Sequence, residues 1–293
     1  MSGKQFFVDR YSKLGWEYRP VELKQAIRIN ITNAKEADTV RRLESRGIEL
    51  EPVSFVPHAH WVRKSAFSVG ATSEYLIGHY SIQEAAAQIP ATLFSDLKDK
   101  TVLDACAAPG GKTIQLADLM HNTGVIFALD VDKRRLTPLS NHLERCRVEN
   151  TIVCHMDARH ASQLKIKFDR ILLDVPCSGN FATDKEWFTR RTIEDVKRNA
   201  ALQRQILTEA EAILNDDGEI VYSTCSLEPE ENELNIDWAT EHLELQAEPV
   251  ECYGETAPTS IFGKRVASTV ASCKRIWPGQ TQGFFVCKLK KRV

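Results

Sequence analysis

From residue 101 onward, short apolar runs alternate with segments of helical periodicity. Strands are predicted where nearly every position is apolar: TVLDAC (101–106), VIFALDV (125–131), TIVCHMDA (151–158), FDRILLDV (168–175), GEIVYSTC (218–225) and QGFFVCKL (282–289). Helices are predicted between them, at 112–120, 133–146, 192–214 and 229–243. Continuously apolar strands separated by helices are typical of a buried, mostly parallel sheet. The pattern therefore predicts a doubly wound α/β domain with helices on both faces of the sheet.

The first quarter of the chain has a different pattern. Strands are predicted at 28–31, 50–55 and 61–64, with a helix at 36–46 that ends at Gly47. A further helix is predicted at 81–89, within IGHYSIQEAAAQIP, leading into the larger domain. We therefore expect a small N-terminal α/β domain at residues 1–75 and a larger domain at residues 76–293.

Composition narrows the class of protein. The N-terminus is mixed and polar and no apolar run is long enough to cross a bilayer, so we expect a cytoplasmic protein without membrane contact. None of the eight cysteines forms a CxxC pair or a zinc-spaced cluster with histidine, so no metal site is expected. The net charge of −2 argues mildly against a dedicated nucleic-acid binder but allows a local basic face.

A glycine-rich loop, ACAAPGGKT (105–113), connects the first strand of the larger domain with its helix. A phosphate-binding P-loop would need glycine where the chain has Cys106, so that match is incomplete. A nucleoside cofactor fits better, because Gly110 and Gly111 allow close approach of the backbone and the helix N-terminus offers free N–H groups.

Acidic residues end the strands that follow this loop. Asp130 lies 19 residues after Gly111, the usual position of an acid that binds ribose hydroxyls. Asp157 ends the third strand and is a candidate for binding an adenine amino group, and Asp174 ends the fourth. The alternative, that Asp130 and Asp157 cap helices or turns, stays open.

Two cysteines also follow strands, Cys177 in LLDVPCSGN and Cys225 in VYSTCSLEPEEN. In a doubly wound sheet both would face the glycine-rich loop. A thiolate that adds to carbon 6 of a pyrimidine makes carbon 5 nucleophilic, an Asp can supply the proton or hydrogen bond at N3, and a second group can assist release. Asp174, Cys177 and Cys225 meet these three needs, while the alternative is that both thiols only pack.

The segments DACAAPGGKT, LLDVPCSGN, YSTCSLEPEENE and RIWPGQTQGFFVCKL resemble the motif series of the Nop/Sun family of RNA cytosine-5 methyltransferases. The resemblance extends from about Arg28 to the C-terminus. It implies a Rossmann-like methyltransferase domain, dependent on S-adenosyl-L-methionine (SAM), behind a small RNA-recognition-like domain.

The resemblance also implies roles for single residues. Cys225 would be the nucleophile and Cys177 would assist product release, whereas in DNA cytosine-5 methyltransferases the Pro-Cys thiol is the nucleophile; DNA is therefore not the expected substrate. The residues implied to contact SAM are Ala107, Ala108, Pro109, Gly110, Gly111, Lys112, Thr113, Asp130, Arg135, Asp157 and Asp174.

The substrate is indicated by two further segments. KSAFSVGATSEYLIGHY and CSGNFATDKEWF look most like the compact archaeal members that act on tRNA, so tRNA is the expected partner and rRNA the alternative. Departures from the family pattern, such as Ala85–Ala87 after Gln83-Glu84, concern the substrate and leave the core chemistry intact. Basic clusters suited to phosphate contact lie at 41–46, 63–64, 133–135, 190–191 and 288–292. Two other classes remain open, a non-catalytic RNA-binding assembly factor that retains SAM and a nucleotide-hydrolysing enzyme.

Overall fold

The computed structural model describes residues 3–292, which form two compact units. We name them after their main features. The glycine-loop unit comprises residues 24–158 and 168–172, and the thiol unit comprises residues 3–23, 159–167 and 173–292. The domain boundary expected between residues 75 and 76 stays a prediction.

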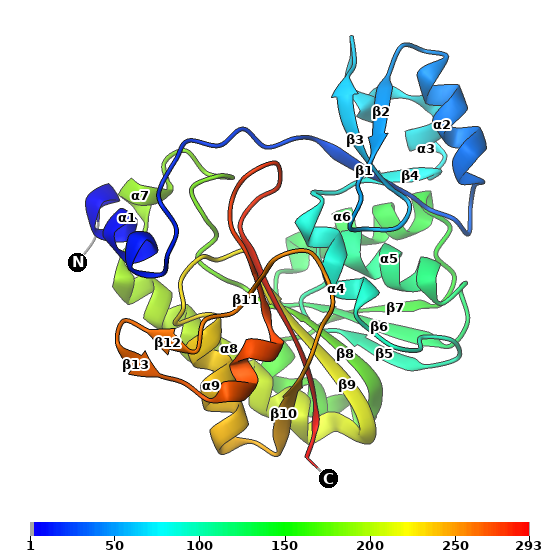
Figure 1. Ribbon diagram of the computed structural model, residues 1–293. Helices are drawn as coiled ribbons and strands as arrows, with labels where there is room; N and C mark the ends of the chain where they lie inside the picture. The colour runs from blue at the N-terminus through cyan, green and yellow to red at the C-terminus, as the bar shows by residue number, and fades with distance from the viewer. Residues whose placement is uncertain (1–2, 293) are drawn as a thin grey trace. The chain divides into compact units, whose positions relative to one another are not determined.

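The glycine-loop unit contains a small antiparallel sheet (Figure 1). Its strands, in spatial order, are β2 (Glu49–Pro52), β3 (Ala59–Lys64), β1 (Ala26–Ile29) and β4 (Tyr80–Ile82). Two helices accompany it, α2 (Glu36–Glu44) and α3 (Ser73–Leu76). Ile27, Ile29, Leu43 and Tyr80 form its core, so β1 contributes the central apolar strand and α2 covers it with Leu43.

The same unit contains four parallel strands, in the order β8 (Phe168–Asp174), β5 (Thr101–Asp104), β6 (Val125–Asp130) and β7 (Thr151–His155). The last two residues of β8 belong to the thiol unit. The helices are α4 (Ile89–Thr92), α5 (Gly111–Leu119) and α6 (Lys133–Arg145), with short 3-10 turns at Val69–Ala71 and Ala86–Gln88. Parallel pairing brings the carboxyl ends of these strands to one edge of the sheet.

The thiol unit is built on β9 (Leu214–Thr224) and β15 (Phe284–Lys291), which pair antiparallel. Strands β10 (Leu245–Glu248) and β14 (Lys274–Ile276) both pair with β15, and β11 (Glu255–Thr256) pairs with β14. Strands β12 (Ser260–Ile261) and β13 (Lys264–Arg265) form a separate hairpin. The 3-10 segments are Ala158–Leu164, which begins in the glycine-loop unit, and Ser268–Ser272.

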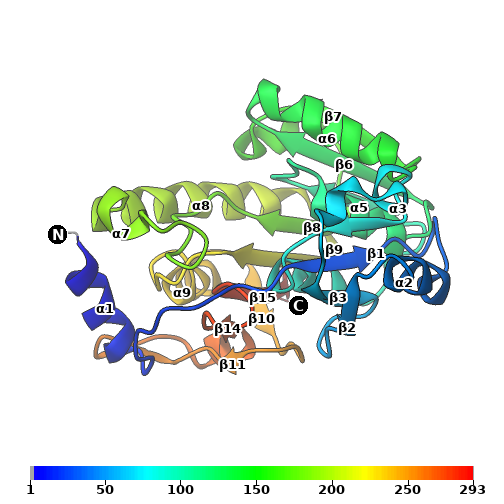
Figure 2. The same ribbon diagram turned by 90° about the horizontal axis from the view of Figure 1, so that it is seen from above.

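Four helices complete the thiol unit: α1 (Lys4–Lys13), α7 (Trp187–Arg190), α8 (Ile193–Ile213) and α9 (Glu233–His242). Helix α8 begins where it does because Thr192 and Asp195 form a reciprocal capping box. Helices α8 and α9 lie side by side (Figure 2), with Asn235 of α9 donating to Gln203 of α8. Within residues 3–292 we find no helix with both the length and the apolar character needed to cross a membrane.

The predicted strands and helices from residue 101 onward are confirmed, with boundaries shifted by a few residues. The helix predicted at 81–89 is wrong, because Tyr80–Ile82 form β4 instead. This strand pairs with the edge of β1, and the Tyr80 hydroxyl donates to the Val69 carbonyl at 2.6 Å. The Glu84 carboxylate then accepts the backbone N–H groups of Ala86 and Ala87, so helical structure starts only after Glu84.

Candidate active site

The glycine-rich loop has a fixed backbone between β5 and α5. Gly110 is the N-cap of α5 with a φ of +106°, and a Cβ there would lie 2.9 Å from Leu139 Cδ1. A side chain is thus excluded by both conformation and space. Thr113, in the first turn of α5, donates to Asp104 Oδ2 at 2.8 Å and fastens the helix to the end of β5.

Asp130 lies at the end of β6, as predicted, and holds this loop. Its Oδ2 accepts the Ala108 N–H at 3.3 Å, and its Oδ1 accepts the Asp132 N–H at 2.9 Å. Arg135 of α6 forms an ion pair with Asp130, with 3.3 Å between Nη1 and Oδ2, and also donates to the Ala108 carbonyl. Ala108, Asp130 and Arg135, which are all predicted to contact SAM, therefore lie together, and the Arg135 guanidinium contacts the Asp130 carboxylate.

The rest of the predicted cofactor set lies on the same unit, except Asp174. His142 Nδ1 lies 2.8 Å from the Pro109 carbonyl oxygen, and half-buried Asp157 follows the end of β7 by two residues. Gly110 has no side chain to cap α5, and a helix N-terminus of this kind suits a ligand carboxylate because its backbone N–H groups point along the helix axis. A loop without Cβ atoms, an uncapped helix start and an acid at the next strand end suit a nucleoside cofactor that carries a carboxylate.

The two candidate thiols meet in the thiol unit. Cys177 follows β8 and Cys225 follows β9, and their sulfur atoms lie 3.2 Å apart. The hydrogen bond to Cys225, together with burial, raises the pKa of the Cys177 thiol well above its ordinary value. Asp174, at the end of β8, accepts a hydrogen bond from Ser223 Oγ at 2.9 Å. Cys177 therefore keeps its proton beside Cys225.

Buried polar side chains that the sequence interpretation missed hold the two thiol segments together. Glu231 accepts the Ser178 N–H at 2.9 Å and the Ser178 hydroxyl at 2.6 Å. Asn180 donates to the carbonyl oxygens of Cys225, at 2.7 Å, and Gly283, at 3.1 Å. Ser178, Asn180 and Glu231 are at most 1% exposed, so each hydrogen bond is shielded from water. They occur in the quoted CSGN and EEN motifs, but only the fold reveals their partners.

Helix α1 contacts the segment that follows Cys225. Arg10 Nε lies 2.9 Å from Glu228 Oε2, and Arg10 Nη2 lies 2.5 Å from Glu230 Oε2. Burial raises the pKa of Glu228 to about 7, although the positive charge of Arg10 opposes this shift. The sequence interpretation did not predict α1, whose apolar face is short.

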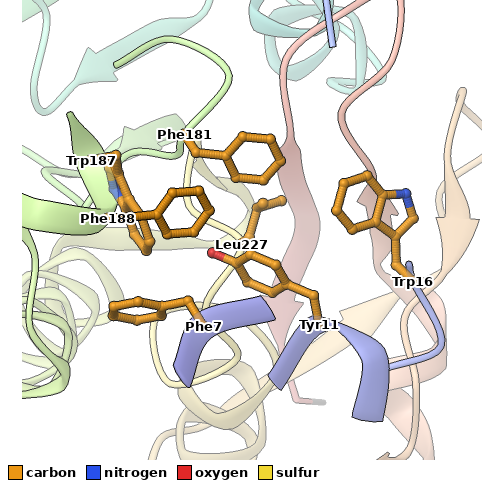
Figure 3. Packing of buried hydrophobic residues seen from close by; sticks show 7 residues of the cluster. All are labelled: Phe7, Tyr11, Trp16, Phe181, Trp187, Phe188 and Leu227. Atoms are coloured by element: carbon orange, nitrogen blue, oxygen red, sulfur yellow. The ribbon is translucent and has the colours of Figure 1, made fainter. Parts of the chain in front are cut away.

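An aromatic cluster surrounds the same segment (Figure 3). Phe7 and Tyr11 of α1 pack with Leu227, two residues after Cys225, and with a set of aromatic residues from other parts of the unit: Trp16, Phe181, Trp187 and Phe188. Phe7 and Trp187 meet edge to face with 4.6 Å between ring centroids. Gly283 is required beside this cluster, because a Cβ there would lie 2.3 Å from Leu227 Cδ2.

Comparison with known proteins gives consistent matches over nearly the whole chain. Residues 91–290 match the family model described as 16S rRNA methyltransferase RsmB/F. The chain is 36% identical over 283 residues to the 28S rRNA (cytosine-C(5))-methyltransferase of Mus musculus, covering 93% of this chain and 35% of that protein. It is 36% identical over 286 residues to the 25S rRNA (cytosine-C(5))-methyltransferase nop2 of Schizosaccharomyces pombe, covering 93% and 46%. The chain thus spans a third to a half of the length of these two relatives.

A solved structure is similar over its full length. The methyltransferase homolog protein from Pyrococcus horikoshii is 35% identical and superimposes with a TM-score of 0.89. The similarity covers 99% of this chain and 95% of the Pyrococcus chain. The fold described above is therefore that of an existing methyltransferase homologue of nearly the same extent.

Proposed function

The chain belongs to the 16S rRNA methyltransferase RsmB/F family, and from this premise we propose that it methylates carbon 5 of a cytosine in RNA. Membership confirms the predicted resemblance to the Nop/Sun family, the Rossmann-like methyltransferase fold and SAM as the family's cofactor. The observation that carries the proposal is the pair of thiols 3.2 Å apart, Cys225 directly after β9 and Cys177 three residues after β8.

Cys225 is the proposed nucleophile. Its sulfur forms a bond to carbon 6 of the cytosine, which makes carbon 5 electron-rich enough to accept a methyl group. A base, which can be a water molecule, then takes the proton from carbon 5, and the electron pair of that bond restores the aromatic ring as the bond between carbon 6 and the Cys225 sulfur breaks. The hydrogen bond from Asn180 holds the Cys225 carbonyl, and the buried Glu231–Ser178 contact joins the segments that follow the two thiols.

Cys177 and Asp174 are proposed to assist this cycle. The raised pKa of Cys177 keeps its thiol protonated, so it can donate a proton to the Cys225 sulfur, 3.2 Å away, as that sulfur leaves carbon 6. Asp174, oriented by Ser223, is proposed to supply the proton or hydrogen bond at N3 of the cytosine. A target cytosine must leave its stack to reach these groups.

The residues proposed to bind SAM are those of the glycine-rich loop, Ala107 to Thr113, with Asp130, Arg135, Asp157 and Asp174. SAM supplies the methyl group as an electrophile. The first turn of α5 suits its carboxylate, and Asp130 suits its ribose. Since Arg135 pairs with Asp130, we propose that it shifts within the site when the ribose hydroxyls bind.

The RNA class is proposed as tRNA, as for the compact archaeal members that the chain resembles. The 35% identity to an archaeal protein, the methyltransferase homolog from Pyrococcus horikoshii, agrees with that resemblance. The second candidate is rRNA, because the names of the mouse and fission-yeast relatives specify rRNA. A cytoplasmic location and RNA contacts of the small sheet stay predictions.

Bisulfite sequencing of tRNA and rRNA incubated with the purified protein and SAM tests the reaction and its substrate together. We expect new protected cytosines in tRNA with the wild-type protein and none with Cys225→Ala, which should still bind SAM. Protected cytosines found only in rRNA would make rRNA the substrate in place of tRNA. Normal turnover by Cys225→Ala would refute the assignment of Cys225 as the nucleophile. If the wild-type protein protects no cytosine in either pool, the enzymatic function fails.

A further inference from the structure

A cavity of about 500 Å³ opens in the thiol unit beside the aromatic cluster. Its walls come from the segment after α1, from the residues before and within β11, and from β14 with the turn that follows. Residues that line it include Trp16, Arg19, Tyr253, Glu255, Arg275 and Trp277. The volume suits a ligand the size of one nucleotide, since small-molecule sites range from about 300 to 1,000 Å³.

The aromatic residues give this cavity flat walls. Trp277 is held between Trp16, which stacks on it with ring centroids 5.3 Å apart and planes 7° apart, and the Arg275 guanidinium, 4.8 Å from its ring centroid. Tyr253 also lines the cavity, and this residue is 47% exposed. A rigid aromatic wall with one accessible ring is the arrangement used to stack nucleobases.

The charges favour a nucleotide over a bare anion. Arg275 is neutralised by a buried ion pair with Glu233, in which Nη2 and Oε2 lie 2.5 Å apart. Glu255 adds a negative charge to the wall, whereas exposed Arg19 adds a positive one. One cation suits a single phosphate, and the Glu255 carboxylate can accept a hydrogen bond from the amino group of a base.

The cavity is connected to the proposed nucleophile through one shared residue. Arg275, in its wall, donates from Nη1 to the Leu227 carbonyl at 2.7 Å, and Leu227 follows Cys225 by two residues. We propose that the cavity binds an unpaired RNA nucleotide near the target cytosine, with its base on Tyr253 and its phosphate at Arg19. This inference rests on the proposed RNA substrate and adds a binding site to it.

The test compares Tyr253→Ala, Tyr253→Phe and Arg19→Ala in the full-length protein. We expect Tyr253→Ala to raise the KM for RNA about 10-fold with kcat and the KM for SAM unchanged, because stacking on one base is lost. Tyr253→Phe keeps the ring and should retain the wild-type KM. Arg19→Ala should weaken RNA binding and reduce its dependence on salt.

Photocrosslinking supplies a readout independent of catalysis. A single-stranded RNA that carries 4-thiouridine is irradiated with the wild-type protein, and we expect adducts on the peptide that contains Tyr253. A wild-type KM in Tyr253→Ala, with crosslinks only outside the cavity, would overturn this inference while leaving the methylation intact. A wild-type protein that neither binds nor methylates RNA would instead defeat the proposed function, and this inference with it.

Discussion

Cys177 and Cys225 are chemically identical side chains in contact, so their surroundings must decide their roles. The hydrogen bond between the sulfurs and the burial of Cys177 raise the pKa of the Cys177 thiol, so this thiol keeps its proton. Cys225 has its backbone fixed by Asn180. These contacts support the proposed order of events, in which Cys225 attacks and Cys177 assists release.

Cys177→Ala is expected to trap the enzyme on its RNA. Without the second thiol the methylated base stays bonded to Cys225, so turnover falls by about 100-fold or more while one covalent adduct accumulates. Denaturing electrophoresis with labelled RNA measures the adduct. The double variant Cys177→Ala/Cys225→Ala should give none, and an adduct with Cys225→Ala alone would reverse the two roles.

The residues that sequence could reveal are those whose role depends on local position. Asp130 and Asp174 were recognisable because strand and acid are adjacent in the chain, and their places at the ends of β6 and β8 agree with the prediction. Glu231 and Ser178 lie 53 residues apart, and no local pattern indicates that they bond. Their side chains became interpretable only when the fold placed the two segments together.

Helices and strands, like single residues, divide into those that a local pattern predicts and those that depend on contacts with distant parts of the chain. The helices and strands after residue 101 follow periodicity, which is a property of the segment itself. Tyr80–Ile82 became a strand because β1 offered a free edge, a tertiary effect that overrides the helical preference of the alanines after it. Helix α1 contributes Arg10, whose hydrogen-bond partner Glu228 lies 218 positions further along the chain.

The contact between α1 and Glu228 makes stability depend on pH. Glu228 titrates near 4.5 when exposed and at about 7 in the folded protein, so the folded state binds the extra proton between these values. The contribution of Glu228 to the free energy of unfolding is therefore greatest below about pH 4.5 and decreases as the pH rises toward 7. From pH 5 to pH 8 the loss attributable to this group is about 2 kcal/mol. Arg10, Glu230 and Tyr11 are the charged or titratable groups that act on it.

Glu228→Gln isolates this contribution, because the amide has the same shape and does not titrate. Urea unfolding at pH 5 and pH 8 should show the wild-type protein losing stability relative to the variant as the pH rises. The opposite trend would mean that the ion pair with Arg10 outweighs burial and that Glu228 is charged in the folded state. Glu230→Gln removes a negative charge that raises the pKa of Glu228, so it should reduce this pH dependence without abolishing it.

At the scale of the whole molecule, charge pairing limits how RNA can be bound. The basic clusters recognised in the sequence carry many acidic partners: Arg41 pairs with Asp38, Arg63 with Glu51, Arg134 with Asp132, Arg190 with Glu186, and Lys288 with Glu219. Three of these pairs join residues within four positions of each other, whereas Lys288 and Glu219 are distant in the chain and only the fold shows that they pair. The net charge of −2 reflects nearly equal numbers of basic and acidic residues.

RNA affinity should therefore depend only weakly on salt. Each phosphate neutralised by a protein cation adds about 0.7 to 0.9 to the slope of log K against log salt, so three or four contacts give a slope of about −3. Fluorescence anisotropy with labelled RNA between low and physiological salt measures it. Because stacking does not release counterions, an affinity dominated by Tyr253 and other aromatic contacts would persist at high salt. A slope steeper than about −6 would require the paired arginines to exchange their carboxylates for phosphates when RNA binds.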